Sequence, residues 1–417
     1  MNIFRIFTHI CCWTIIVICS ATIVSCKKEH EDNPTKDYTR VVLVYMAAEN
    51  SLSTATASDI NEMLRANKLI PKDSKLILYV DDYDTPAIYE IDRQKEVKSA
   101  SALVPVKKYD EDLDSAAPST LDKIMNYTWK NYKADSYGII FWSHGSGWTI
   151  FNGAEQYAKK TPKSSFGIDT NSTAGNYVSK MNISDMASVL AHYGNIDYIL
   201  FDACFMQSVE VAYELRNTTK CIMASPAEIP QNGAPYHIIL PALFEQNFNP
   251  DNVISQYNSY YANQSPPDQS GVLISAIDTR QLESFADATA TVIKNHDIES
   301  IDYSSLVNYY HFLEWGYSMP DMYDMKSVMM NLLTESEYTY WEREFLKLII
   351  SSYSYESWYS ALSNHSIFGG EYIPLDESQF GGINMFMPLD KYNYYSFNNE
   401  YYTTEWGKLM KEKKAFR

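Results

Sequence analysis

In the stretch "IDYILFDACFMQSVEVAYEL", residues 196–215, the pattern of apolar residues changes in the middle. Residues 196–202 form an apolar run that is typical of a strand buried on both faces of a parallel sheet. From Phe205 onward, apolar residues recur at helical spacing, which predicts a helix over 205–216. A buried strand that passes into an amphipathic helix indicates an α/β fold. Cys204 stands at the junction, where it is either a packed thiol or a nucleophile.

The same alternation extends over most of the chain. Apolar runs predict further strands at 40–48, 75–80, 137–143, 221–225, 271–278 and 382–388. Helical spacing predicts further helices at 56–68, 118–133 and 182–194. This order predicts a doubly wound α/β fold, with a mostly parallel central sheet and helices on both faces. We expect this domain to occupy residues 38–285, and residues 286–417 to form a helical C-terminal region whose late strand, at 382–388, returns to the sheet.

The N-terminus predicts export. Residues 1–25 combine a positively charged start, an apolar run and a small residue at the end, as in a secretory signal peptide. Val24, Ser25 and Cys26 resemble a bacterial lipobox, which implies cleavage before Cys26 and lipidation of that cysteine. The polar tether 26–37 favours a lipoprotein over the alternative, an uncleaved membrane anchor. We therefore expect a chain held by lipid in the bacterial cell envelope, at the outer membrane.

Composition narrows the class of function. Of six cysteines, only Cys204 and Cys221 lie in the part that is expected to fold, so the chain is not a disulfide scaffold. The net charge is −18 and no basic stripe is present, which argues against nucleic acid as a partner. The 34 tyrosines fit either interfacial packing or a surface for peptide or sugar. We expect a monomer.

Reactive side chains follow two of the predicted strands. His144 comes just past the strand at 137–143, and Cys204 just past the strand at 196–202. Because parallel strands present their carboxyl ends at one edge of the sheet, we expect both side chains there. The start of a helix would lower the pKa of the thiol, and an imidazole could accept its proton. Each residue alone also fits a plain role, the cysteine in the core and the histidine in a turn.

Four segments carry a resemblance to a known family. They are "VVLVYMAAENSL" (41–52), "IIFWSHGSGW" (139–148), "YILFDACFMQSVEVAYEL" (198–215) and "MASPAEIPQNGAPY" (223–236). On these segments the chain resembles the clostripain family of cysteine peptidases, as a bacterial lipoprotein member, over roughly residues 38–285. The resemblance implies a caspase-like fold and a peptide or protein substrate.

The resemblance also implies roles for single residues. Cys204 is then the nucleophile, His144 is its general base or imidazolium partner, and Gly145 joins the Cys204 amide as an oxyanion donor. Asp202 is implied to line the specificity pocket and to pair with a substrate Arg or Lys. From the residues alone, Asp202 also fits a cap on the following helix, and its charge would oppose a thiolate. Glu228 matches an acidic position of the family, and it either shapes the pocket or faces solvent.

Two positions depart from the family's pattern. Glu49 stands where the family usually has Asp before Asn50, and Ala234 stands where a bulky aromatic residue is common. We expect these departures to affect substrate preference more than the histidine and cysteine.

The polar segment 152–180 is long for a connection in a compact domain. It contains Lys159, Lys160 and Lys163, which are candidate self-cleavage sites because some members of the family cut themselves between His and Cys. Clostripain itself depends on calcium, but the acidic residues here show no EF-hand-like spacing. We therefore expect no metal and no other cofactor.

The sequence thus predicts an exported cysteine endopeptidase that cleaves after Arg or Lys through a His–Cys dyad and an acyl-enzyme. The alternative is a surface lipoprotein that has kept the fold but binds peptide or glycan. A third interpretation, a thiol acyltransferase or transpeptidase, would use the same residues with an amine in place of water.

Overall fold

A computed structural model describes residues 37–149, 166–170, 178–264, 271–310, 320–360 and 371–416. All of its helices and strands belong to one compact unit, Asp37–Arg417. Within the described ranges, the helices are too short or too polar to cross a membrane. The signal peptide and tether expected at 1–37 lie outside the described residues, apart from Asp37 itself.

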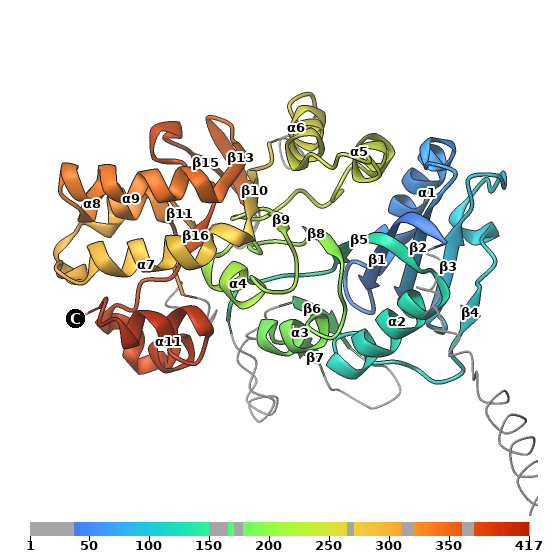
Figure 1. Ribbon diagram of the computed structural model, residues 1–417, viewed down its shortest axis with the longest axis horizontal. Helices are drawn as coiled ribbons and strands as arrows, with labels where there is room; N and C mark the ends of the chain where they lie inside the picture. The colour runs from blue at the N-terminus through green and yellow to red at the C-terminus, as the bar shows by residue number, and fades with distance from the viewer. Residues whose placement is uncertain are drawn as a thin grey trace, which may run out of the picture. The chain divides into compact units, whose positions relative to one another are not determined.

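A nine-stranded sheet forms the centre of this unit, in the order β13-β10-β9-β8-β5-β1-β2-β3-β4 (Figure 1). Its strands are β1 Tyr38–Ala47, β2 Ser74–Asp81, β3 Ala87–Ile91, β4 Lys107–Lys108, β5 Ala134–Trp142, β8 Ile196–Asp202, β9 Cys221–Ala224, β10 Ile274–Asp278 and β13 Ile349–Tyr353. The five central strands, from β9 to β2, are parallel to one another. The strands at both edges are antiparallel. The predicted mostly parallel sheet is confirmed.

The central strands are buried on both faces, which explains their continuous apolar runs. In β1, Val41, Leu43 and Tyr45 belong to one hydrophobic cluster, and the alternate residues Val42 and Val44 belong to another. The two clusters lie on opposite faces of the sheet because successive side chains of a strand point to opposite sides.

Helices cover both faces of the sheet (Figure 1). One cluster includes side chains of α1 Thr56–Ala66, α5 Tyr236–Leu243 and α6 Pro250–Tyr261. The other includes side chains of α2 Pro118–Asn131, α3 Ile183–Leu190, α4 Val209–Glu214, α7 Leu282–Ile293, α8 Met325–Leu332, α9 Glu335–Leu348, α10 Phe397–Tyr401 and α11 Glu405–Glu412. The C-terminal helices therefore share a core with the sheet.

Three smaller sheets complete the unit. They are β6 Phe166–Asp169 with β7 Ser179–Met181, β14 Ser357–Ser360 with β15 Glu371–Pro374, and β11 Asn308–Tyr310 with β12 Met322–Asp324 and β16 Asn384–Met385.

The late strand differs from its prediction. Residues 382–388 were expected to return to the main sheet, but β16 pairs with β12, and the strand that extends the main sheet is β13. Asn384 explains the placement, because its amide donates to the Gln207 carbonyl at 2.9 Å and its side chain donates to the Pro226 carbonyl at 2.8 Å. The segment therefore crosses the loops that follow β8 and β9 instead of lying in the sheet.

Candidate active site

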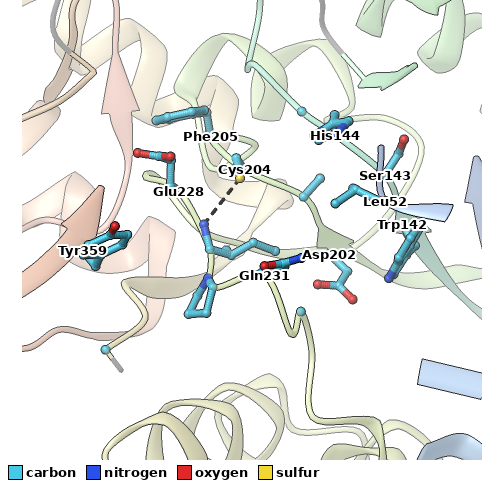
Figure 2. Close-up of a pocket in the computed structure, with 16 residues that line it drawn as sticks. Leu52, Trp142, Ser143, His144, Asp202, Cys204, Phe205, Glu228, Gln231 and Tyr359 are labelled. Atoms are coloured by element: carbon cyan, nitrogen blue, oxygen red, sulfur yellow. Dashed lines mark hydrogen bonds between the residues drawn. The ribbon is translucent and has the colours of Figure 1, made fainter. Parts of the chain in front are cut away.

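The register of the central strands brings two strand ends together. Trp142, the last residue of β5, lies beside Asp202, the last residue of β8. His144 and Cys204 each follow two residues later, and both line one cavity of about 420 Å³. Most of the residues that line this cavity come from the ends of β5 and β8 and from the loops after β5, β8 and β9 (Figure 2). Leu52, Gly271 and Tyr359 of β14 complete the lining. The two reactive side chains thus share a site at the carboxyl edge of the sheet.

Gly145 permits the close approach of these two loops. A Cβ atom at this position would lie 2.6 Å from the Cys204 carbonyl oxygen and 2.8 Å from the Met206 sulfur. Distances this short between non-bonded atoms require the backbone to move. Only glycine therefore lets the histidine loop lie directly against the cysteine loop.

Cys204 does not start a helix, so the predicted activation by a helix macrodipole is wrong. Helix α4 begins at Val209 with Ser208 as its N-cap, and it has six residues. The chain between is a turn in which Phe205 takes a left-handed conformation, with φ of +62°. Dipole effects fall off within the first turn, so they do not reach the thiol.

The surroundings of the thiol instead favour its neutral form. Burial and the nearby Glu228 carboxylate raise the pKa of Cys204 to about 12. The Ile229 amide donates a 3.5 Å hydrogen bond to the sulfur, which offsets part of the rise (Figure 2). Without a ligand, the site therefore holds a thiol at neutral pH.

His144 is oriented by a residue that the sequence analysis missed. Its Nε2 atom shares a 2.8 Å hydrogen bond with the Ser51 hydroxyl. Burial and the charge of Lys180 lower the pKa of His144, so the ring is neutral at pH 7. The Lys180 ammonium is buried and lacks a hydrogen-bond partner among the residues that the structure describes, and burial lowers its pKa to about 8. A neutral imidazole that lines the same cavity as a neutral thiol is suited to accept its proton.

Asp202 forms the acidic floor of the cavity. Its side chain is 3% exposed, and it accepts hydrogen bonds from the Ala234 amide at 2.9 Å and the Tyr236 hydroxyl at 2.7 Å. Burial raises the pKa of Asp202 to about 6, although the two hydrogen bonds lower it in part. The carboxyl is therefore mainly ionised at pH 7. Because α4 starts at Val209, Asp202 is not its cap. A buried carboxylate at the base of a cavity is a site for a cationic group.

A sequence profile of the clostripain family matches residues 44–416. The chain belongs to the clostripain family. Clostripain from Hathewaya histolytica is 25% identical over 208 residues, which are 45% of this chain and 38% of clostripain, so the match spans well under half of that relative.

Two solved structures share the fold of this family member. A secreted C11 cysteine protease from Bacteroides thetaiotaomicron, in complex with an irreversible peptide inhibitor, is 29% identical with a TM-score of 0.74. The similarity covers 89% of this chain and 98% of that chain. An inactive zymogen C11 protease from Parabacteroides distasonis is 24% identical with a TM-score of 0.73 over 91% of this chain and 99% of its own. The predicted caspase-like architecture is confirmed.

Glu228, the acidic position expected from the clostripain family, lines the cavity. Figure 2 shows Cys204 between His144 on one side and Glu228 on the other. The Ser360 hydroxyl of β14 donates to the Glu228 carboxylate, so the C-terminal half of the chain holds this wall in place.

Asp59 is a further acidic group behind the cavity that the sequence analysis missed. It accepts a 2.7 Å hydrogen bond from the Trp142 indole, and burial together with the charge of Asp202 raises its pKa to about 8. The only sequence signal was an acidic residue beside Ile60 on the buried side of α1. Asp59 is therefore protonated at pH 7, which leaves Asp202 as the charged group at the floor.

Ala234, where the family often has a bulky aromatic residue, is buried in the core beside the pocket rather than at its lining. Its amide still holds Asp202, so the substitution leaves the floor intact. The lipidation residue Cys26 and the candidate self-cleavage residues Lys159, Lys160 and Lys163 lie outside the described residues.

Proposed function

We propose that this member of the clostripain family is a cysteine endopeptidase that cleaves after Arg or Lys. The observation that carries the proposal is the shared cavity of His144, Cys204 and Asp202. The position of Asp202 supports a basic residue on the acyl side of the cleaved bond, because its carboxylate is buried, ionised and close to the nucleophile. The peptide inhibitor in the Bacteroides thetaiotaomicron structure supports a peptide substrate.

The reaction starts from a neutral pair of groups. A bound peptide places its scissile carbonyl over Cys204, whose proton moves to His144 as the sulfur attacks the carbonyl carbon. The Gly145 and Cys204 amides receive the oxyanion of the tetrahedral intermediate. The imidazolium then protonates the leaving amine, and the acyl-enzyme forms. Water, deprotonated by His144, attacks the thioester and releases the carboxylic acid and the thiol.

Ser51 acts in this scheme as a positioning residue. Its hydroxyl occupies one ring nitrogen of His144, which leaves the other nitrogen for the thiol and the leaving group. The arrangement is then a dyad with a supporting hydroxyl.

Hydrolysis of fluorogenic peptides tests the proposal. Peptides that end in Arg, Lys or a neutral residue are offered to residues 37–417 and to Cys204→Ala under reducing conditions. We expect release after Arg and Lys, lost in Cys204→Ala. Release after neutral residues alone would overturn the role of Asp202.

The same assay separates the two alternative functions. If neither protein releases fluorophore, even after limited nicking of the 152–180 segment, the peptide- or glycan-binding alternative is favoured. A product joined to an added amine would identify a transpeptidase.

We also propose export with a lipid on Cys26, action as a monomer, and self-cleavage at Lys159, Lys160 or Lys163. The secreted relative from Bacteroides thetaiotaomicron supports export. Mass spectrometry of the protein from its own envelope tests the lipid and the cleavage together. A full-length chain that is active and uncut would contradict self-cleavage, and an unmodified Cys26 would contradict the lipid anchor.

A further inference from the structure

Phe205, the residue after Cys204, holds a backbone conformation that disfavours its own side chain. Its φ is +62°, in the left-handed region, where the Cβ atom crowds the backbone and a bulky residue is a genuine outlier. The residue does not end or start a helix, because α4 begins at Val209. A strained residue of this kind persists only where its surroundings over-determine it, and such residues gather at functional sites.

Backbone contacts clamp the turn at Phe205 between two loops. Its amide donates to the Ala227 carbonyl in the loop after β9, and the amide two residues later donates to another carbonyl of that loop, both at 2.9 Å. The carbonyls face the loop after β5. A Cβ atom on Gly147 would lie 3.2 Å from the Phe205 oxygen, and one on Gly145 would lie 2.6 Å from the Cys204 oxygen. Rotation about φ turns these two sets of groups against each other, so a negative φ would break one set of contacts.

The Phe205 ring is anchored in a third hydrophobic cluster, separate from the two that cover the sheet. It is 1% exposed and meets the Tyr310 ring edge-on, with centroids 5.7 Å apart and planes at 89°. The cluster also contains Met322 and Trp358, and Cys204 packs against it. Burial of a phenylalanine ring outweighs the strain of one left-handed residue. The C-terminal part of the chain therefore supplies the force that keeps the turn in place.

We propose that Phe205 is a positioning residue, whose left-handed turn, anchored by the buried ring, fixes the thiol of Cys204 relative to His144. Figure 2 shows Phe205 and Glu228 on one side of Cys204 and His144 on the other. Among the residues that the structure describes, none accepts a hydrogen bond from the Cys204 amide, so the turn leaves that amide available to an oxyanion. The inference rests on the proposed peptidase function, because the placement of the thiol matters to the reaction performed there.

A comparison of glycine with alanine at position 205 tests the turn. Neither residue carries the ring, but glycine adopts a positive φ freely and alanine does not. Thermal unfolding and peptide hydrolysis are measured on residues 37–417, with Arg and Lys peptides, well below both transitions. Phe205→Gly should have a Tm about 1–3 °C above that of Phe205→Ala and a kcat roughly 3–10 times higher, with KM values within about twofold. Phe205→Leu keeps an apolar anchor and should restore most of the rate.

Leu273 provides the matched control pair. It is fully buried in the same cluster as Phe205, and its φ is not positive. At such a position glycine loses more chain entropy on folding than alanine does. Leu273→Ala should therefore have a higher Tm than Leu273→Gly, which is the opposite of the order expected at position 205.

The outcomes separate this inference from the proposed function. If the parent protein does not cleave after Arg or Lys, the peptidase proposal fails, and the positioning role fails with it. If the parent cleaves but Phe205→Ala equals or exceeds Phe205→Gly in Tm and kcat, only the positioning role is overturned. A lower Tm with an unchanged kcat in both variants would make Phe205 a packing residue. If neither small variant folds, Phe205→Val is compared with Phe205→Leu, and it should be slower because β-branched residues resist positive φ.

Discussion

Lys180 sets the charge environment of His144. Its buried ammonium lowers the pKa of the imidazole, in addition to the effect of burial. Lys180→Met removes that charge, so the pKa of His144 should rise. Because the neutral ring is the proposed base, the acid limb of kcat/KM against pH should move to higher pH. Lys130→Met, at an exposed position on α2, should leave the profile unchanged.

The stability of Lys180→Met gives a second, independent readout. The folded-state pKa of Lys180 is about 8, below its usual value of 10.5, so the folded state resists the charged form. The unfolded chain binds more protons between these values, and the parent protein should therefore gain stability as pH rises from about 8 to 10.5, by up to about 3 kcal/mol. The variant should lack this gain. An identical pH dependence in parent and variant would show that the ammonium is solvated.

Ser51→Ala tests the orientation of His144. Loss of the 2.8 Å hydrogen bond frees the ring to rotate, and we expect kcat/KM to fall roughly 5–30-fold, mainly through kcat. Ser51→Thr keeps the hydroxyl and should restore most of the rate. A fall in stability without a fall in kcat would assign Ser51 a structural role instead.

Glu228→Gln should make the thiol more reactive. The Glu228 carboxylate contributes to the raised pKa of Cys204, and Gln removes the charge while it keeps an oxygen for Ser360. The rate of alkylation by iodoacetamide at pH 7–8 should rise roughly 3–10-fold. Glu356→Gln, at an exposed position, serves as the control. An unchanged rate would mean that burial alone suppresses the thiolate.

At the scale of elements, the packing of the loop after β5 against the loop after β8 fixes the position of Cys204. Gly145→Ala places a methyl group 2.6 Å from the Cys204 carbonyl oxygen, and that backbone atom cannot move without displacing Cys204, the proposed nucleophile. We expect at least about a hundredfold loss of kcat/KM and about 1–3 kcal/mol of destabilisation. Gly194→Ala is a matched control, because its Cβ would meet nothing within 4 Å. Equal behaviour of the two variants would refute the close approach.

The parallel strands were predictable because burial on both faces leaves an unbroken apolar run, as in β1 and β8. The places of His144 and Cys204 at the edge of the sheet were also predictable, because each residue comes just after the end of such a run. The start of α4 was not predictable, because Phe205 and Leu215 continue the apolar spacing across a turn that only tertiary contacts create. The Phe205 amide bonds to the Ala227 carbonyl at 2.9 Å, and Phe205 is held at positive φ.

The other features that the sequence did not predict depend on contacts between residues far apart in the chain. Ser51 meets His144 across 93 residues, and Asn384 reaches Pro226 across 158. A two-residue strand such as β16 carries no periodicity of its own, so its partner is set by hydrogen bonds that no local pattern encodes.

At the scale of the whole described unit, the C-terminal helices and the sheet should unfold together. Trp406 of α11 is fully buried and packs edge-on against Tyr213 of α4, with ring centroids 5.5 Å apart, and it also stacks on Phe285 of α7. Residues of α2, α3, α4 and α7 through α11 belong to one hydrophobic cluster, so cutting the chain near 285 would expose a large apolar face.

Trp406→Ala tests this coupling. The cavity should cost about 3–5 kcal/mol, and the loss should appear in a single transition that also abolishes peptide hydrolysis on heating. Tyr394→Ala is the control, because Tyr394 is 89% exposed and its removal should change stability by less than about 0.5 kcal/mol. A separate early transition in Trp406→Ala, with catalysis intact beyond it, would show that residues 286–417 form an independent domain. A single shifted transition would instead mean that the wall built by Glu228 and Ser360 depends on the whole fold.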